Sequence, residues 1–200
     1  MVPMIQEAER VIAEAVKHFG LTLKPEQICV TVQSKGRKQA VGWFGPERWN
    51  TDKKKTVHEI NMSAEHLKTH DMGELMLHEL AHAENNVLGV KDCSGRQHNK
   101  KFKAMAERLG LLVHPRDSSV GYGFTDLADG AKTFLAGIKF DGKIFSAYRG
   151  GSGAKKGKVG SRLIKCECGE CGYVARTTNK WLEDTGAPLC PCNAKPMEVA

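Results

Sequence analysis

The sequence of 200 residues has no apolar run that approaches the length of a membrane span. Its N-terminus also lacks the basic start and the following apolar stretch of an export signal. These absences exclude a membrane-spanning protein and leave a cytoplasmic location as the expectation. We find no internal repeat along the chain.

Cysteine is scarce over most of the chain. Only Cys29 and Cys93 precede residue 166, whereas the other five of the seven cysteines lie within the last 35 residues. A disulfide framework would distribute its cysteines over the fold, so this pattern favours a metal-binding clip near the C-terminus.

Length and composition limit the size of the core. A chain of 200 residues with 40% hydrophobic content can bury one core and carry a small appendage, but it cannot form two full-sized domains. The 30 Lys and Arg residues exceed the 23 Asp and Glu residues and give a formal charge of +7. This balance favours an acidic partner, nucleic acid being the commonest, although many basic proteins bind none. We expect a monomer by default.

The first part of the chain predicts an α+β fold. Apolar residues at helical spacing indicate a helix over residues 5–19, which Gly20 ends. Three short β-rich runs follow and predict a small, mostly antiparallel sheet, at residues 28–32, 40–44 and 56–62. Turn-forming residues and two basic patches, at 35–38 and 53–55, separate these runs.

Two further helices are expected to pack beside this sheet. Asp71 and Glu74 form a capping-box pattern before an apolar stretch that Gly89 ends, which predicts a central helix. A second amphipathic segment over residues 98–109 ends at Gly110. The loop between them is short enough for an antiparallel helix pair.

We divide the chain into four parts. Residues 1–114 form the α+β core, and residues 115–148 form an accessory segment without an assigned function. Its Asp141-Gly142 pair predicts a tight hairpin. Residues 149–163 are rich in Gly, Ser and Lys and indicate a flexible basic linker to a cysteine-rich tail at 164–200.

The central helix carries the segment His78-Glu79-Leu80-Ala81-His82. Histidines four residues apart project from one face of a helix and can bind one cation, and zinc suits imidazole ligands. Zinc would lower the pKa of a water molecule to roughly 7. Glu79 could then take a proton from the water during attack on a peptide carbonyl and pass it to the leaving amine. The alternative interpretation is a pair of ordinary surface histidines beside an incidental glutamate.

A catalytic zinc site needs a third protein ligand. His98 is the best candidate because it opens the next helix, and Asp92 and Glu107 are the alternatives. The remaining histidines lack such spacing, and we expect ordinary surface or core roles for them: His18, His58, His66, His70 and His114.

Three segments together resemble the SprT-like family, the metallopeptidase group that includes Spartan: residues 58–63, the motif at 78–82, and His98-Asn99-Lys100-Lys101-Phe102. The resemblance covers roughly residues 5–112. Gly42-Trp43-Phe44 and Asn99 make the chain look more like phage-encoded and bacterial members. A location at the nucleoid, or in the host cytoplasm if the chain is phage-encoded, would follow.

The resemblance implies a zincin-like minimal core, in which a small sheet precedes the helix that carries the motif. It also implies that His78, His82 and His98 are ligands of a catalytic zinc and that Glu79 is the catalytic base. Many members of the family carry a C-terminal zinc ribbon.

The tail contains two close cysteine pairs, Cys168 with Cys171 and Cys190 with Cys192. Four thiolates in two pairs fit a closed tetrahedral site, so we expect a ribbon that folds around a structural zinc. Cys166 is a candidate substitute ligand, and disulfide formation is the alternative.

Basic residues surround this tail, and DNA could bind them through its phosphates. The candidates are Lys155, Lys156, Lys158, Arg162, Lys165, Arg176 and Lys180. They could instead offset the charge of the thiolates or keep a linker solvated. Tyr173 and Trp181 are candidates either for base stacking or for the core of the ribbon.

The leading hypothesis is therefore a zinc-dependent endopeptidase that cleaves DNA-associated proteins and is held on DNA by its tail. One alternative is a non-catalytic DNA-binding protein that keeps zinc for structure, although Glu79 would then have no purpose. The other is a peptidase that acts on a protein regulator without DNA.

Overall fold

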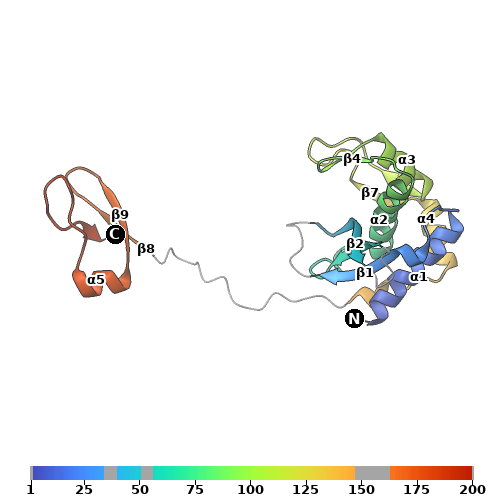
Figure 1. The fold of residues 1–200 in the computed structure, drawn as a ribbon, viewed down its shortest axis with the longest axis horizontal. Helices are drawn as coiled ribbons and strands as arrows, with labels where there is room; N and C mark the ends of the chain where they lie inside the picture. The colour runs from blue at the N-terminus through green and yellow to red at the C-terminus, as the bar shows by residue number, and fades with distance from the viewer. Residues whose placement is uncertain (1, 34–39, 51–55, 147–162, 200) are drawn as a thin grey trace. The chain divides into compact units, whose positions relative to one another are not determined.

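The computed structural model describes residues 2–33, 40–50, 56–146 and 163–199. The chain divides into two compact units, Met1–Gly150 and Gly151–Ala200 (Figure 1). Within the described ranges, no helix is both long and apolar enough to cross a membrane.

The first unit mixes helices with short strands. Its helices are α1 (Val2–His18), α2 (Met72–Val87), α3 (Lys100–Arg108) and α4 (Asp129–Gly137), with the 3-10 helices η1 (Pro25–Gln27) and η2 (Gly142–Ser146). Its strands are β1 (Ile28–Gln33), β2 (Gly42–Asn50), β3 (Thr56–Ser63), β4 (Cys93–Ser94), β5 (Gln97–His98), β6 (Leu111–Val113) and β7 (Thr125–Leu127). The predicted α+β class is therefore confirmed.

The main sheet has the order β1-β3-β2, with β3 in the centre. β3 runs antiparallel to β2 and parallel to β1, so the prediction of a mostly antiparallel sheet is wrong for one of its two strand pairs. The physical reason is that β3 inserts between the two earlier strands. It pairs antiparallel with β2, the strand that precedes it, and because β1 and β2 run in opposite directions it lies parallel to β1.

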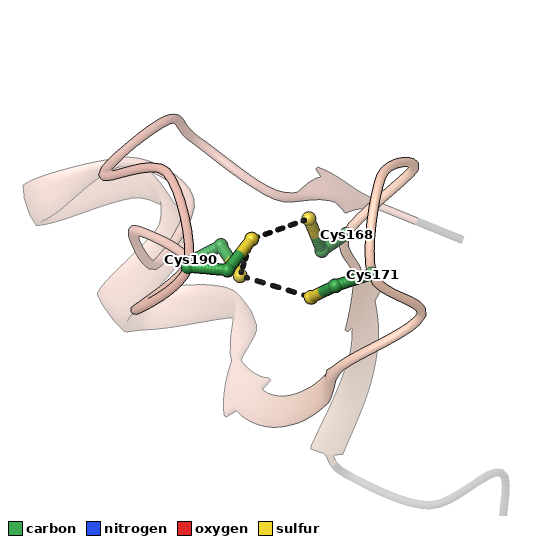
Figure 2. A group of neighbouring side chains, drawn as sticks. Cys168, Cys171 and Cys190 are labelled. Atoms are coloured by element: carbon green, nitrogen blue, oxygen red, sulfur yellow. Dashed lines mark hydrogen bonds between the residues drawn. The ribbon is translucent and has the colours of Figure 1, made fainter.

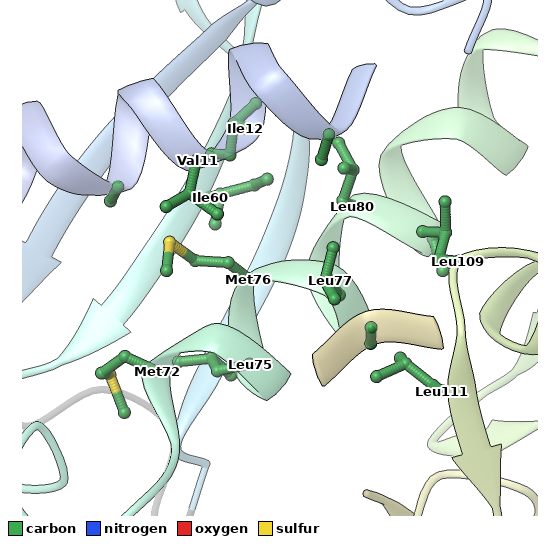
Figure 3. Close-up of a cluster of buried hydrophobic side chains, with 14 of the residues drawn as sticks. Val11, Ile12, Ile60, Met72, Leu75, Met76, Leu77, Leu80, Leu109 and Leu111 are labelled. Atoms are coloured by element: carbon green, nitrogen blue, oxygen red, sulfur yellow. The ribbon is translucent and has the colours of Figure 1, made fainter. Parts of the chain in front are cut away.

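One face of the sheet packs against α1 and α2 and forms the core. Figure 3 shows Val11 and Ile12 of α1 beside Ile60 of β3, with Met76 and Leu80 of α2 next to them. All these side chains are buried. Burial of this apolar surface is the main force that holds α2 against the sheet.

α2 begins and ends where the sequence predicts. The side chain of Asp71 accepts hydrogen bonds from the backbone N–H groups of Gly73 and Glu74 and caps the helix. Gly89, with a φ of +68°, follows the last turn. In a full capping box the side chain of Glu74 would accept from the backbone N–H of Asp71. Here the carboxylate of Glu74 accepts instead from the hydroxyl of Thr125.

The hairpin predicted around Asp141-Gly142 is wrong. Residues there form η2, which follows α4, and the Asp141 side chain accepts from the N–H of Lys143 at 3.1 Å in a local turn. Phe134 and Phe145 are buried in the core of the first unit. Their burial favours helical turns that pack inward over a free hairpin, and the Asp-Gly signal marks only the turn.

The second unit contains β8 (Leu163–Glu167), β9 (Val174–Thr178), α5 (Asn179–Thr185) and β10 (Glu198–Val199). The strands form an antiparallel sheet in the order β10-β8-β9. Its small buried cluster consists of Cys166, Cys168, Cys190 and Met197. The predicted linker at 149–163 lies outside the described residues except for its last position.

Candidate metal centre

The α2 helix carries His78 and His82 one turn apart on the same face. Their ring centroids are 5.3 Å apart, and both rings pack against Phe102 of α3. The apolar face of α2, which includes Leu77 and Leu80, is buried in the core. This burial fixes the rotation of the helix, and the two imidazoles lie against α3.

His98 lies close to this pair although it comes from another element. It does not open the next helix as predicted, because Asn99 caps α3, which begins at Lys100; His98 occupies β5, which pairs with β4 in a short hairpin. Its Nε2 atom lies 3.0 Å from Nε2 of His82, and its ring centroid is 5.2 Å from that of His78. One ligand atom from each of the three rings lies within 4.8 Å of the others, so they can hold a metal ion.

Each of the three rings is oriented by a partner at its Nδ1 atom. His82 Nδ1 lies 2.7 Å from a carboxylate oxygen of Asp92, and His98 Nδ1 lies 3.0 Å from the carbonyl oxygen of Val120. His78 Nδ1 lies 2.9 Å from the hydroxyl of Thr125. Partners of this kind fix the tautomer of a metal-binding histidine and direct its other nitrogen at the ion.

The contact between His82 and His98 fits a cation better than a hydrogen bond. A carboxylate and a carbonyl can only accept, so in neutral rings both protons lie on Nδ1 and both Nε2 atoms carry lone pairs. Two lone pairs facing each other at 3.0 Å repel unless a cation or an extra proton lies between them. Nitrogens bound at 2.0–2.1 Å to one tetrahedral zinc would lie roughly 3.3 Å apart, close to this distance.

The protonation of the three rings follows from their surroundings. Burial lowers the pKa of His78 well below its usual value, and the neighbouring His82 and His98 lower it further. Burial and His82 also lower the pKa of His98. Burial would lower the pKa of His82 too, but its hydrogen bond to Asp92 and the negative charges of Glu79 and Asp92 together raise it. Neutral rings at His78 and His98 are the forms that bind metals.

Glu79 is buried next to the histidines. Burial raises the pKa of its carboxyl group to about 7, while His82 and a hydrogen bond from the backbone N–H of Phe44 act in the opposite direction. Phe44 belongs to the edge strand β2, so this strand holds the carboxylate in place. A carboxylate with a pKa near neutrality can accept and release a proton.

The alternative ligands Asp92 and Glu107 have other roles. Asp92 could hold an ion together with His82 and Cys93, but it lies at hydrogen-bond distance from Nδ1 of His82. Burial, together with the neighbouring Asp92, raises the pKa of Cys93 to about 12, so its thiol stays protonated. Glu107 forms an ion pair with Lys103 on α3 at 3.6 Å. The three-histidine group is therefore the better candidate.

Residues from the accessory segment complete the site, and sequence reasoning missed them. Besides Val120 and Thr125, two glycines of the intervening loop lie against His98. A Cβ at Gly121 would meet the His98 carbonyl oxygen at 2.2 Å, and one at Gly123 would meet His98 Nδ1 at 2.5 Å. The Gly121-Tyr122-Gly123 pattern is the only sequence signal that could have indicated this close approach.

The second unit brings together the four predicted cysteines. The Sγ atoms of Cys168 and Cys192 are 3.8 Å apart, those of Cys171 and Cys190 are 3.5 Å apart, and those of Cys190 and Cys192 are 3.3 Å apart (Figure 2). Thiolates bound at about 2.3 Å to a tetrahedral zinc would lie roughly 3.8 Å apart, whereas a disulfide needs about 2.05 Å. All four are free cysteines, so the group fits a metal and not disulfides.

Two details support this four-cysteine cluster. Hydrogen bonds from the backbone N–H groups of Cys171 and Glu170 lower the pKa of the Cys168 thiol to about 7, which favours the thiolate that binds metals. Cys166, the candidate substitute, is buried in β8 opposite Ala175 and belongs to no metal-binding group among the described residues.

The predicted nucleic-acid residues are only partly described. Lys155, Lys156, Lys158 and Arg162 lie outside the described residues. Lys165 and Arg176 are cross-strand neighbours on β8 and β9, and Lys180 lies on the exposed side of α5. Tyr173 is 52% exposed and Trp181 is 57% exposed, so neither belongs to the core of this unit.

Comparison with known proteins gives one match. The model of the SprT-like family matches residues 8–119. This range contains all three histidines and Glu79, and it ends just before Val120. No curated protein and no solved structure matches the chain.

Proposed function

This chain belongs to the SprT-like family, and from that premise we propose that it is a zinc-dependent endopeptidase. In this proposal His78, His82 and His98 hold the ion and Glu79 is the general base. The convergence of the three imidazoles carries the proposal, because one ligand atom from each lies within 4.8 Å of the others and a cation would stabilise the facing Nε2 lone pairs of His82 and His98. When bound, zinc supplies Lewis-acid chemistry that polarises a peptide carbonyl and makes water more acidic.

The protein's own groups have distinct tasks. The carboxylate of Glu79 takes the proton of the attacking water and delivers it to the nitrogen of the leaving amine. The N–H of Phe44 orients this carboxylate from the strand side. Asp92, Val120 and Thr125 hold the three rings in one tautomer, so that the site is formed before a substrate arrives.

We further propose that the substrates are DNA-associated proteins. The second unit would hold a structural zinc through Cys168, Cys171, Cys190 and Cys192 and contact DNA. Support comes from the formal charge of +7, from the adjacent Lys165 and Arg176, and from the two exposed aromatic rings of Tyr173 and Trp181. Such rings stack on unpaired bases, and basic side chains bind phosphates.

The test compares Glu79→Gln with a matched control, Glu107→Gln, which changes an exposed glutamate of α3. We expect both variants to bind two zinc ions per chain. Glu79→Gln should cleave casein or a DNA-binding protein at least about 100-fold more slowly than the control. Equal rates for wild type and Glu79→Gln would contradict the enzyme proposal and favour a non-catalytic DNA-binding protein.

The same assay tests the role of DNA. Single-stranded DNA should accelerate cleavage of a DNA-binding substrate, and the effect should weaken as salt rises. Cleavage that is indifferent to DNA at low salt would favour a peptidase that acts on a protein regulator.

A further inference from the structure

The sheet of the first unit has a polar hollow that the metal centre does not use. It has a volume of about 390 Å³ and is lined by Gln33, Trp43, Arg48, Trp49 and Glu59. This volume lies within the range of roughly 300–1,000 Å³ that is usual for ligand sites. Two of the three tryptophans of the chain line it.

The strand register explains why the two indoles flank one carboxylate. Trp43 pairs with Asn61 of β3, and Trp49 pairs with Val57, while a bulge takes up the extra residues of β2 between them. Glu59 lies between these two positions on β3 and shares their face, because alternate residues of a strand point the same way. This face is opposite to the one that carries Ile60 into the core.

Glu59 is a buried carboxyl group with one oxygen that accepts from no residue in the described part of the chain. It is only 5% exposed, and its Oε1 atom accepts from the hydroxyl of Thr31 at 2.7 Å and from the amide of Gln33 at 3.0 Å. Asn61 supports this arrangement by donating to Thr31 at 2.6 Å. No described residue donates to Oε2, so the structure leaves acceptor capacity beside the hollow. Burying a charge is costly, and a ligand that donates to this oxygen would offset the cost.

We propose that this hollow binds an unpaired base of a single-stranded nucleic acid. Indole rings stack on bases of any sequence. The second oxygen of Glu59 would accept a hydrogen bond from an exocyclic amino group, as acidic side chains do with the N4 amino group of cytosine. Thymine has no such group, so the hollow should prefer cytosine to thymine.

The charge of the residues that line the hollow fits a nucleic acid better than a neutral peptide. Arg48 lines it, and the whole chain has a formal charge of +7. The guanidinium group of Arg48 would bind a phosphate, while the base itself meets the carboxylate of Glu59. The inference rests on the proposed association with DNA, but it does not depend on peptidase activity.

Tryptophan fluorescence can test the hollow separately from the second unit. A Trp181→Phe chain keeps only Trp43 and Trp49, whereas a Trp43→Phe/Trp49→Phe chain keeps only Trp181. Each full-length chain is titrated with oligo(dC), with oligo(dT) and with poly-glutamate. The proposal expects saturable quenching of the Trp181→Phe chain by oligo(dC), at a concentration about fivefold or more below that for oligo(dT).

Three results would overturn the proposal. Quenching of the Trp43→Phe/Trp49→Phe chain without quenching of the Trp181→Phe chain would place DNA on the second unit. The proposed DNA association would then stand, but the hollow would not bind a base. Absence of quenching in both chains, together with no binding of labelled oligonucleotide, would overturn both the proposed base site and the proposed association with DNA. Equal quenching of the Trp181→Phe chain by poly-glutamate and oligo(dC) would assign the hollow to an acidic peptide.

Glu59→Gln in the Trp181→Phe chain tests whether Glu59 distinguishes cytosine from thymine. An amide preserves the size of the side chain and still accepts from Thr31, so the fold should persist. The preference for oligo(dC) over oligo(dT) should disappear while quenching by oligo(dT) stays within about twofold. A preference that survives in Glu59→Gln would remove Glu59 from base recognition and overturn this part of the proposal.

Discussion

Gly123 packs directly against the ring of His98. A Cβ at position 123 would come within 2.5 Å of Nδ1 and 2.8 Å of Cε1 of that ring. His98 is further held by its N–H and Nδ1, both within 3.0 Å of the carbonyl oxygen of Val120. The loop that follows the matched family range therefore fixes the position of the third candidate ligand.

Gly123→Ala should displace His98 and weaken metal binding at the proposed three-histidine site. The added methyl group cannot fit beside the ring, so the imidazole must rotate or the loop must move. We expect the zinc affinity of the three-histidine site to fall about 10- to 100-fold, as for other changes that misorient a ligand. Zinc release to a competing chelator measures this. Gly137→Ala, where no atom lies within 4 Å of the added Cβ, is the matched control and should bind zinc like wild type.

Thr125→Val tests the contribution of the accessory segment at the other histidine. The change removes the hydroxyl that lies 2.9 Å from His78 Nδ1 and leaves this nitrogen without its partner. We expect a loss of about 10-fold or more in zinc affinity or in cleavage rate, with little change in the melting temperature. Thr133→Val, at an exposed position of α4, provides the comparison. Equal effects of the two changes would show that His78 needs no orienting hydroxyl.

The parts of this site that follow from local periodicity were predictable. The spacing of His78 and His82, the Asp71 cap and the end of α2 at Gly89 each depend on contacts within a few residues, and the structure has all of them. The approach of His98 was predictable as well, because the short loop after α2 limits where the next segment can lie.

The orienting partners could not be predicted in the same way. Thr125 is separated from His78 by 47 residues and Val120 from His98 by 22 residues. Contacts of this kind depend on the tertiary packing of a loop with little periodicity. The direction of β1 escaped prediction for the same reason, since no local signal tells whether β3 will insert between two earlier strands.

Cysteine substitutions should distinguish the proposed zinc ligands of the second unit from its buried cysteine that binds no metal. Cys171→Ser removes one member of the four-cysteine cluster and should lower the zinc content from two ions to one, because a structural site needs its four ligands. Cys166→Ser changes a buried cysteine outside this cluster and should keep both ions. Metal analysis of the purified chains decides this. Loss of zinc from Cys166→Ser with retention in Cys171→Ser would exchange the two assignments.

Glu7 links α1 to the segment around η2 and should make stability depend on pH. Its carboxylate accepts from Arg10 at 2.7 Å and from the N–H of Asp141 at 3.0 Å. The hydrogen bond from Arg10, against the opposing effect of burial, lowers the pKa of Glu7 below its ordinary value of 4.5. Because the folded-state pKa is the lower one, this contribution is complete above about pH 4.5 and is lost as pH falls through the folded-state value.

Glu7→Gln should therefore destabilise the first unit at pH 7 by about 1 kcal/mol, and the difference from wild type should shrink steadily below pH 4.5. Urea unfolding of both chains at several pH values measures this. Glu14→Gln, on the same helix, is the control and should follow wild type throughout. A destabilisation by Glu7→Gln that stays constant down to pH 3 would show that the charge of Glu7 is irrelevant. The loss would then come from altered packing between α1 and the segment around η2.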